Sequence, residues 1–184
     1  MPKYFVTPMR TLEERIILTR LRVRTMFLWL EDSSVRNYPI ECERVTSQRV
    51  TSQLKGLQGA FRYIFCPLSI SGHSDHLAVR SAAIDYWISC GRKPRICFYE
   101  DLPYAAKMKE PEVEVETRVK ELTRCCGHLS VQYNPLDVNQ FRRKLALSRL
   151  YLTQNDHRTF LEKHAKGLGK KCRSAYAERY VRCS

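Results

Sequence analysis

Two histidines and an aspartate lie close together in the segment Ser71-Gly72-His73-Ser74-Asp75-His76. The histidines are three positions apart, so if the segment begins a helix, both rings lie on one face, one turn apart. Neutral imidazole is a good zinc ligand, and a neighbouring carboxylate can fix its tautomer. The spacing therefore indicates a site at which one ring binds a metal and the other faces a reacting group.

The segments on either side of this group have the pattern of a strand and a helix. The apolar run Phe61–Cys66 predicts a buried strand, and Pro67–Gly72 predicts the loop that leaves its carboxyl end. Ser74–Cys90 predicts a helix that Gly91 ends. We expect its apolar face to consist of Leu77, Ile84, Trp87 and Ile88. This arrangement would place the histidines where a strand passes into a helix.

Acidic residues follow two other predicted strands. Thr25–Leu30 is an apolar run typical of a strand buried on both faces, and Asp32 comes just after it. Arg95–Tyr99 predicts a third strand, and Glu100 and Asp101 follow it directly. Because the carboxyl ends of parallel strands meet at one edge of a sheet, we expect these acids to converge on the histidine segment.

The remaining segments predict further helices and strands around this site. In the first half, Arg10–Leu21 predicts a helix with Thr11 as its cap and acids in its first turn. The stretch Tyr38–Gly59 is polar and contains the tandem pentapeptide RVTSQ-RVTSQ, for which a small duplication within a surface helix is the favoured interpretation. In the second half we expect an edge strand at Val113–Thr117, a strand at Leu129–Tyr133 ended by Asn134-Pro135, a helix from the cap Asp137 to Gln154, a solvated loop at Lys163–Lys171 and a short last element at Ala175–Val181. The alternation of strands and helices predicts an α/β fold with a mainly parallel, Rossmann-like sheet flanked by helices.

Size and composition limit the class of protein. The chain has 184 residues, of which 43% are apolar, as expected for one globular domain spanning residues 1–184. No run approaches the roughly 18 to 20 apolar residues of a membrane helix, and the first residues lack the apolar core of a secretory signal. The eight cysteines include no C-x-x-C pair, and several lie in apolar runs. We therefore expect a soluble, cytoplasmic protein with reduced thiols.

The net charge of +13 raises the alternative of an anionic partner. Only Arg142–Lys144 and Lys163–Arg173 are locally dense in basic residues, and no nucleic-acid-binding motif accompanies them. A basic protein that binds nucleic acid or an anionic membrane surface therefore remains an alternative, which rests on charge alone.

Several motifs together resemble those of the PIG-L/LmbE-type zinc-dependent de-N-acetylases. The segment Pro67–Leu77, containing SGHSDH, is similar to the second motif of that family. Further similarities are FYEDLPY at Phe98–Tyr104, Lys144-Leu145-Ala146 with Tyr151-Leu152-Thr153-Gln154, YAERY at Tyr176–Tyr180, and Arg10-Thr11-Leu12-Glu13. The resemblance implies hydrolysis of an N-acetyl group from an amino sugar or its glycoside, with zinc as the cofactor.

The same resemblance implies roles for individual residues. His76 would ligate zinc, and His73, tuned by Asp75, would stabilise the oxyanion or protonate the leaving amine. Arg10 and Asp32 would contact sugar hydroxyls, and Asp101 would belong to the same substrate-binding group.

One family motif is absent from this sequence. Family members open with a strand ending in A-H-P-D-D-E, which supplies the other two zinc ligands and the general base, and this chain contains no such motif. The chain therefore resembles the later two thirds of the family domain, an N-terminally incomplete form in which we expect catalysis to fail. The second hypothesis for the function of this chain is a non-catalytic module that binds amino sugars. Without the first strand, we also expect a reorganised sheet or a homo-oligomer that covers the exposed edge.

Overall fold

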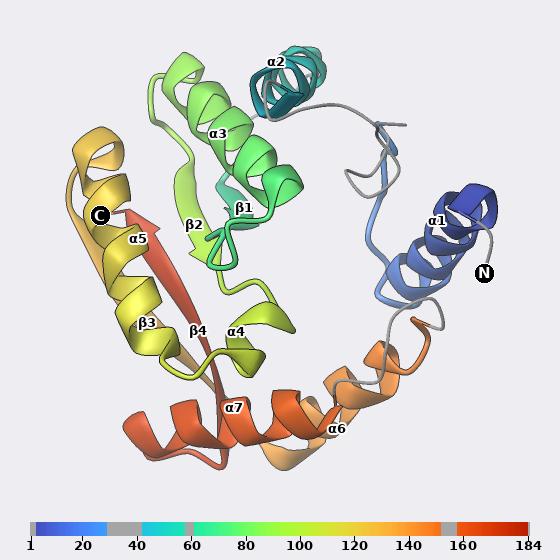
Figure 1. The fold of residues 1–184 in the computed structure, drawn as a ribbon, viewed down its shortest axis with the longest axis vertical. Helices are drawn as coiled ribbons and strands as arrows, with labels where there is room; N and C mark the ends of the chain where they lie inside the picture. Colours follow the sequence, from blue (N-terminus) through green and yellow to red (C-terminus); the bar gives the residue numbers. More distant parts are fainter. Residues whose placement is uncertain (1–2, 29–41, 58–60, 152–157, 184) are drawn as a thin grey trace.

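A computed structural model describes residues 3–28, 42–57, 61–151 and 158–183 (Figure 1). The helices are α1 (Lys3–Arg20), α2 (Cys42–Lys55), α3 (Ser74–Ser89), α4 (Tyr104–Lys107), α5 (Pro111–Cys126), α6 (Val138–Ser148) and α7 (Arg158–Lys171). The strands are β1 (Tyr63–Pro67), β2 (Arg95–Tyr99), β3 (Leu129–Leu136) and β4 (Tyr176–Cys183). The α/β class predicted from the sequence is confirmed, with helices flanking a four-stranded sheet.

The sheet has the strand order β1-β2-β4-β3 and is mixed. Strands β1 and β2 are parallel, with Tyr63 opposite Arg95, whereas β4 is antiparallel to both β2 and β3. This corrects the expectation of a mainly parallel sheet. The reason is the connection from β3 to β4: α6 and α7 lie at the end of the sheet where β3 finishes, so the chain re-enters from that end and the next strand must run antiparallel (Figure 1).

Strand β1 lies at the edge of the sheet and is half buried. Cys66 is buried, but Phe65 is 64% exposed and Tyr63 is exposed as well. The prediction of a buried strand was therefore right in position and wrong in burial, because only one face of β1 meets the core. The expectation that a second copy of the chain covers this edge stays a prediction.

The main core lies between one face of the sheet and helices α3 and α5. Its largest fully buried side chains on the strands are Ile96, Phe98 and Val181. They pack with Trp87 of α3 and Leu122 of α5. This packing holds α3 against β1 and β2 and thereby fixes the position of its first turn, which carries the histidines.

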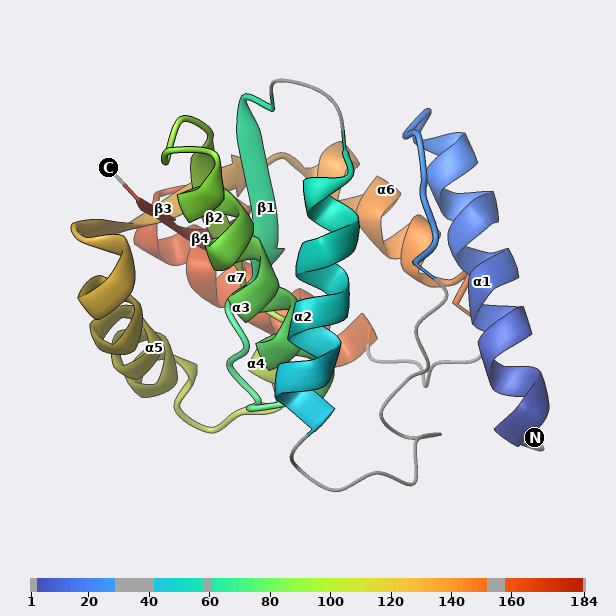
Figure 2. The same cartoon turned by 90° about the horizontal axis from the view of Figure 1, so that it is seen from above.

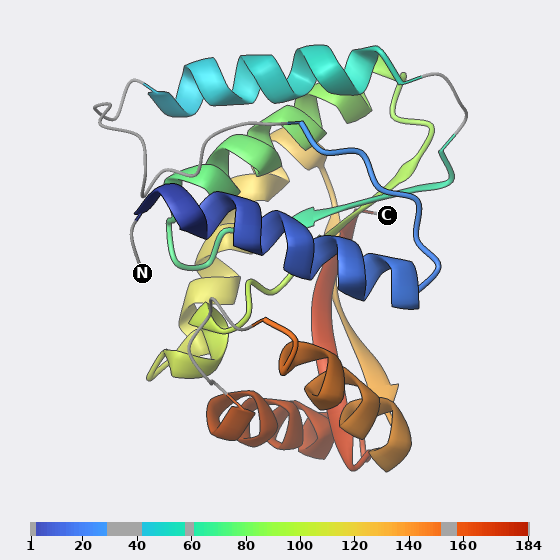
Figure 3. The same cartoon turned by 90° about the vertical axis from the view of Figure 1, so that its right-hand side faces the viewer.

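Helix α2 packs along the outside of α3 (Figures 2 and 3). The surface helix predicted around the tandem pentapeptide is confirmed; Thr46, Ser47 and Val50 form its buried side. Because α2 covers α3, the buried residues of α3 include Ala78 and Ala82, while Ile88 is 45% exposed. The predicted apolar face of α3 was therefore only partly right.

Two segments of the second half are helical, contrary to prediction. Residues 113–117 lie in α5, which begins with Pro111 and carries two acids in its first turn, both helix-start signals. Residues 163–171 lie in α7, which buries Ala165 and Leu168. Gly169 packs directly on β4, since a Cβ there would lie 2.9 Å from Tyr176 backbone atoms. Glycine therefore serves close helix–strand packing here and does not mark a loop.

The ends of several elements also differ from the sequence-based expectation. Helix α1 begins before Thr11, so Thr11 is not its cap, and β3 continues through Pro135. Residues 23–28 form no strand, and positions 29 and 30 lie outside the described residues. The Asp137 cap is confirmed as a capping box with Gln140, but α6 ends at Ser148, and residues 152–157 are not described.

Among the helices that the structure describes, none is long and apolar enough to span a membrane.

Candidate functional site

Two loops meet beyond the carboxyl ends of β1 and β2. The strands are adjacent and parallel, so residues 68–73 after β1 lie against residues 100–104 after β2. The backbone N–H of Leu68 donates to the carbonyl of Tyr99 at 2.8 Å, and the N–H of Ile70 donates to Asp101 Oδ2 at 2.7 Å. Gly72 has a φ of +68°, a conformation that glycine adopts without strain as the loop turns into α3. The predicted convergence of these two strand ends is confirmed.

The carboxylate of Asp101 lies beside the Nδ1 atom of the His76 ring. Its Oδ1 lies 3.0 Å from His76 Nδ1, and the side chains are 0% and 31% exposed, respectively. Neither of these two atoms makes a hydrogen bond in the described part of the chain, so the contact is a close polar approach between the carboxylate and the ring. Asp101 is thus placed to orient the imidazole and is closed to solvent, rather than open to a ligand. Of the two ring nitrogens, Nε2 is the one left for a ligand.

His73 and His76 lie side by side at the N-terminal end of α3, as their spacing predicts. Their ring centroids are 5.1 Å apart. Tyr104 of α4 completes the group, with its ring 5.9 Å from that of His73 and 5.6 Å from that of His76. His73 is the N-cap residue of α3, and its Nδ1 is buried without a hydrogen-bond partner in the described part of the chain. We call His73, His76, Asp101 and Tyr104 the histidine rim.

The other predicted site residues lie in different positions. Asp75 is in the first turn of α3, where the helix dipole favours an acid. Arg10 lies in α1, a helix linked to the chain after α6 by the hydrogen bond from Tyr151 Oη to Glu14 Oε1 at 3.0 Å. Asp32 lies outside the described residues. The structure therefore brings together His73, His76 and Asp101 from the predicted set.

The histidine rim does not fit a complete catalytic zinc centre. Such a centre usually takes three protein ligands and keeps one position open. Within residues 3–28, 42–57, 61–151 and 158–183, no three His, Cys, Asp or Glu side chains are gathered so as to hold a metal ion. The carboxylate of Asp101 lies next to His76 Nδ1 and is buried, so it is placed to orient the ring and not to bind a metal together with it.

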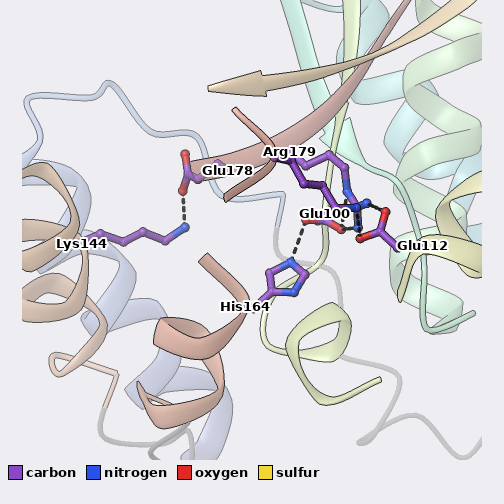
Figure 4. Close-up of polar contacts among 7 residues, drawn as sticks. Glu100, Glu112, Lys144, His164, Glu178 and Arg179 are labelled. Carbon is purple, nitrogen blue, oxygen red and sulfur yellow. Dashed lines mark hydrogen bonds and ion pairs between the residues drawn. The ribbon is translucent and has the colours of Figure 1, made fainter. Parts of the chain in front are cut away.

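A second polar cluster surrounds Glu100, the residue before Asp101 (Figure 4). Arg179 Nε donates to Glu100 Oε1 at 2.9 Å, and His164 Nε2 lies 2.9 Å from Glu100 Oε2. Arg179 also binds Glu112, whose other oxygen is 2.7 Å from Lys171 Nζ. Burial disfavours the charge of Arg179, but Glu100 and Glu112 outweigh it and raise its pKa.

Sequence reasoning missed His164 because its segment was predicted to be a loop. Leu161, Ala165 and Leu168 recur at helical spacing around it, and this signal places His164 on a helix beside its apolar side. Tyr104 was recognised only as the last residue of the FYEDLPY segment. No spacing rule links it to the histidines, since the contact depends on β1 and β2 being neighbours.

Comparison with known proteins identifies the fold. No protein-family model and no curated protein sequence matches the chain. The solved structure of the A40926 pseudoaglycone deacetylase superimposes with a TM-score of 0.66 at 18% identity, over 94% of this chain and 69% of that one. A deacetylase–teicoplanin complex gives 0.65 at 16%, over 94% and 72%. The zinc-inhibited form of teicoplanin deacetylase gives 0.62 at 16%, over 95% and 73%. The chain therefore has the fold of these deacetylases.

Proposed function

We propose that the chain is a PIG-L/LmbE-like domain whose histidine rim binds the N-acetylated amino sugar of a glycoconjugate. The observation that carries this proposal is the placement of His73 and His76 side by side at the carboxyl ends of two parallel strands, with Asp101 behind His76. Ligands in α/β sheets bind at this edge. The fold shared with the A40926 pseudoaglycone deacetylase and with the deacetylase of the teicoplanin complex supports an acetylated ligand.

Within this proposal each residue makes a different contact with the ligand or its neighbours. His76 Nε2 and His73 present hydrogen-bonding groups to the acetamido group, and the buried carboxylate of Asp101 fixes the orientation of the His76 ring. The family resemblance gives His73 the role of protonating a leaving amine or donating to an oxyanion, and we propose that in this chain it serves binding. Arg10 and Asp32 are proposed as contacts to sugar hydroxyls.

Hydrolysis needs more than the described residues provide. Attack on an amide requires an activated water and a general base, which in this family zinc and its aspartate supply. The described part of the chain does not gather such a set around His73 and His76. We therefore propose that this chain binds an acetylated amino sugar without turning it over.

Calorimetry with the chelator-treated chain and N-acetylglucosamine conjugates tests the proposal. We expect binding without metal, weakened in His73→Ala and His76→Ala and unchanged in the control His128→Ala, since His128 is exposed just before β3. Acetate release and metal content are measured in parallel. Absence of binding would contradict the proposed ligand, and stoichiometric zinc with acetate release would contradict the proposed inactivity.

A surface for anionic partners is the second candidate. Helices α6 and α7 lie together at one end of the molecule and carry the exposed residues Arg142, Arg143, Lys163 and Lys170 (Figure 1). Lys166 of the same surface is paired with Glu162 at 2.8 Å, which reduces the free positive charge. Binding of duplex DNA that falls steeply with added salt would favour this candidate, and salt-independent binding would exclude it.

A further inference from the structure

A cavity lies between the sheet and helices α6 and α7, and the histidine rim does not line it. Its volume is about 580 Å³, within the roughly 300–1,000 Å³ typical of small-molecule sites. The aromatic walls are Phe65 of β1, Tyr99 of β2, Tyr180 of β4 and Phe141 of α6. The rest of the apolar lining consists of Leu102, Leu161, Ala165, Leu168 and Ala177. We call this space the aromatic cavity.

The charged groups in the walls of the aromatic cavity already have partners. Lys144 forms an ion pair with Glu178, and Glu100 is held between His164 and Arg179 (Figure 4). A charged ligand would have to displace one of these pairs or lose its hydration without compensation, and both cost free energy. The cavity therefore favours an uncharged ligand.

Two of the aromatic residues that line the cavity are exposed to solvent. Phe65 is 64% exposed and Tyr99 is 45% exposed, although both lie on strands of the sheet. Sheet register places Tyr99 opposite Tyr180, so these two rings come from adjacent strands. Exposed rings around a hollow of this size are favourable partners for another ring, which would remove apolar surface from water and stack against them.

We propose that the aromatic cavity is a second binding site and takes an uncharged aromatic ligand. The proposal does not depend on the function of the histidine rim. The two sites meet at the loop after β2: Glu100 belongs to the wall of the cavity, and the next residue, Asp101, lies beside His76.

Titration with N-phenyl-1-naphthylamine, an uncharged aromatic probe that fluoresces when bound in an apolar site, tests the proposal. We expect saturable binding of one probe per chain. Phe65→Ser and Leu161→Ser should each weaken it about three- to tenfold, the range for loss of one ring or side-chain contact. Phe160→Ser is the matched control, because Phe160 is 48% exposed, adjoins Leu161 on α7 and does not line the cavity.

Three further results separate the outcomes. His76→Ala should bind the probe as the wild type does, and loss of probe binding in this variant would overturn the assignment to a separate site. Equal affinity of Phe65→Ser, Leu161→Ser and Phe160→Ser would also overturn it. Because Phe65 is exposed, its variant should melt as the wild type does. A dimer in light scattering that Phe65→Ser alone dissociates would show that a second copy covers the rings, and would overturn the proposal.

Discussion

Glu100 and Asp101 are consecutive residues whose carboxylates serve two separate groups of side chains. Asp101 accepts from the Ile70 N–H at 2.7 Å and lies 3.0 Å from His76 Nδ1. Glu100 accepts from Arg179 Nε at 2.9 Å and contacts His164. The loop after β2 is thus shared by the histidine rim and the aromatic cavity, so its conformation is fixed from both sides.

Replacement of Asp101 by asparagine should loosen the histidine rim. The side chain is fully buried, and an amide in place of a carboxylate weakens the acceptor for Ile70 N–H and directs a donor or a neutral oxygen at His76. We expect a loss of about 1–3 kcal/mol in the free energy of unfolding. Urea denaturation measures this loss, and nitrogen NMR of His76 reports the changed surroundings of Nδ1. Asp85→Asn, at an exposed position of α3, is the control; equal stability of the two variants would contradict the role of Asp101.

Replacement of Arg179 by methionine should destabilise the protein strongly. The Arg179 and Glu100 side chains are 1% and 4% exposed, so the variant leaves a buried carboxylate with only His164 as a partner. Removing one member of a buried pair costs about 3–5 kcal/mol. The double variant Arg179→Met with Glu100→Gln should recover part of the loss, because the unpaired charge is gone. Lys166→Met breaks an exposed pair and should change stability little; a similar small effect of Arg179→Met would contradict the prediction.

The ion pairs of Glu112 should make stability fall in acid. Burial opposes ionisation of this carboxyl, but Lys171 and Arg179 outweigh it and lower its pKa below 4.5. A lowered folded-state pKa contributes stability that is present above the unfolded-state value and is lost as the pH falls through the folded-state value. Melting temperatures should therefore drop below about pH 4.5, and less steeply in Glu112→Gln. Glu116→Gln, exposed on α5, should retain the wild-type slope.

The cysteine thiols should differ widely in reactivity. Cys66 is 2% exposed, and burial raises its pKa; burial also raises the pKa of Cys126 to about 12. Cys125 is exposed beside them. Because the thiolate is the reactive form, iodoacetamide at pH 8 should label Cys125 in the native protein, and Cys66 and Cys126 only in urea. Peptide mass spectrometry measures the order, and early labelling of Cys66 would contradict its buried position.

The sequence was most informative where local signals and tertiary packing agree. Residues 95–99 were predicted as a strand with the observed bounds, and the helix from Ser74 was ended by Gly91 as expected. The sequence pattern was misleading at residues 113–117. Valine alternates with acidic residues there, but Val115, Leu122 and Cys126 are also spaced so that they lie on one face of a helix, and this is the face that α5 buries. The direction of β4 could not be predicted, since it depends on where α6 and α7 lie.

Of the candidate site, the sequence predicted the arrangement of residues that are close together along the chain and the loops that meet, but not the detailed contacts between those loops. The spacing of His73 and His76 predicted that the rings lie on one face, and the strand-end rule placed Asp101 near them. The burial of Asp101 behind the ring depends on the pairing of β1 with β2 and on the Ile70 backbone, which sequence spacing does not encode. The involvement of His164 required recognising α7.

The central position of β4 constrains how the protein is made. This strand is the last of the four along the chain, yet it joins β3 to the β1-β2 pair. During synthesis on the ribosome, β1 and β2 can pair early, but the sheet stays in two parts, with open edges, until residues 176–183 emerge. Nascent chains lacking these residues should therefore be the form most in need of a chaperone.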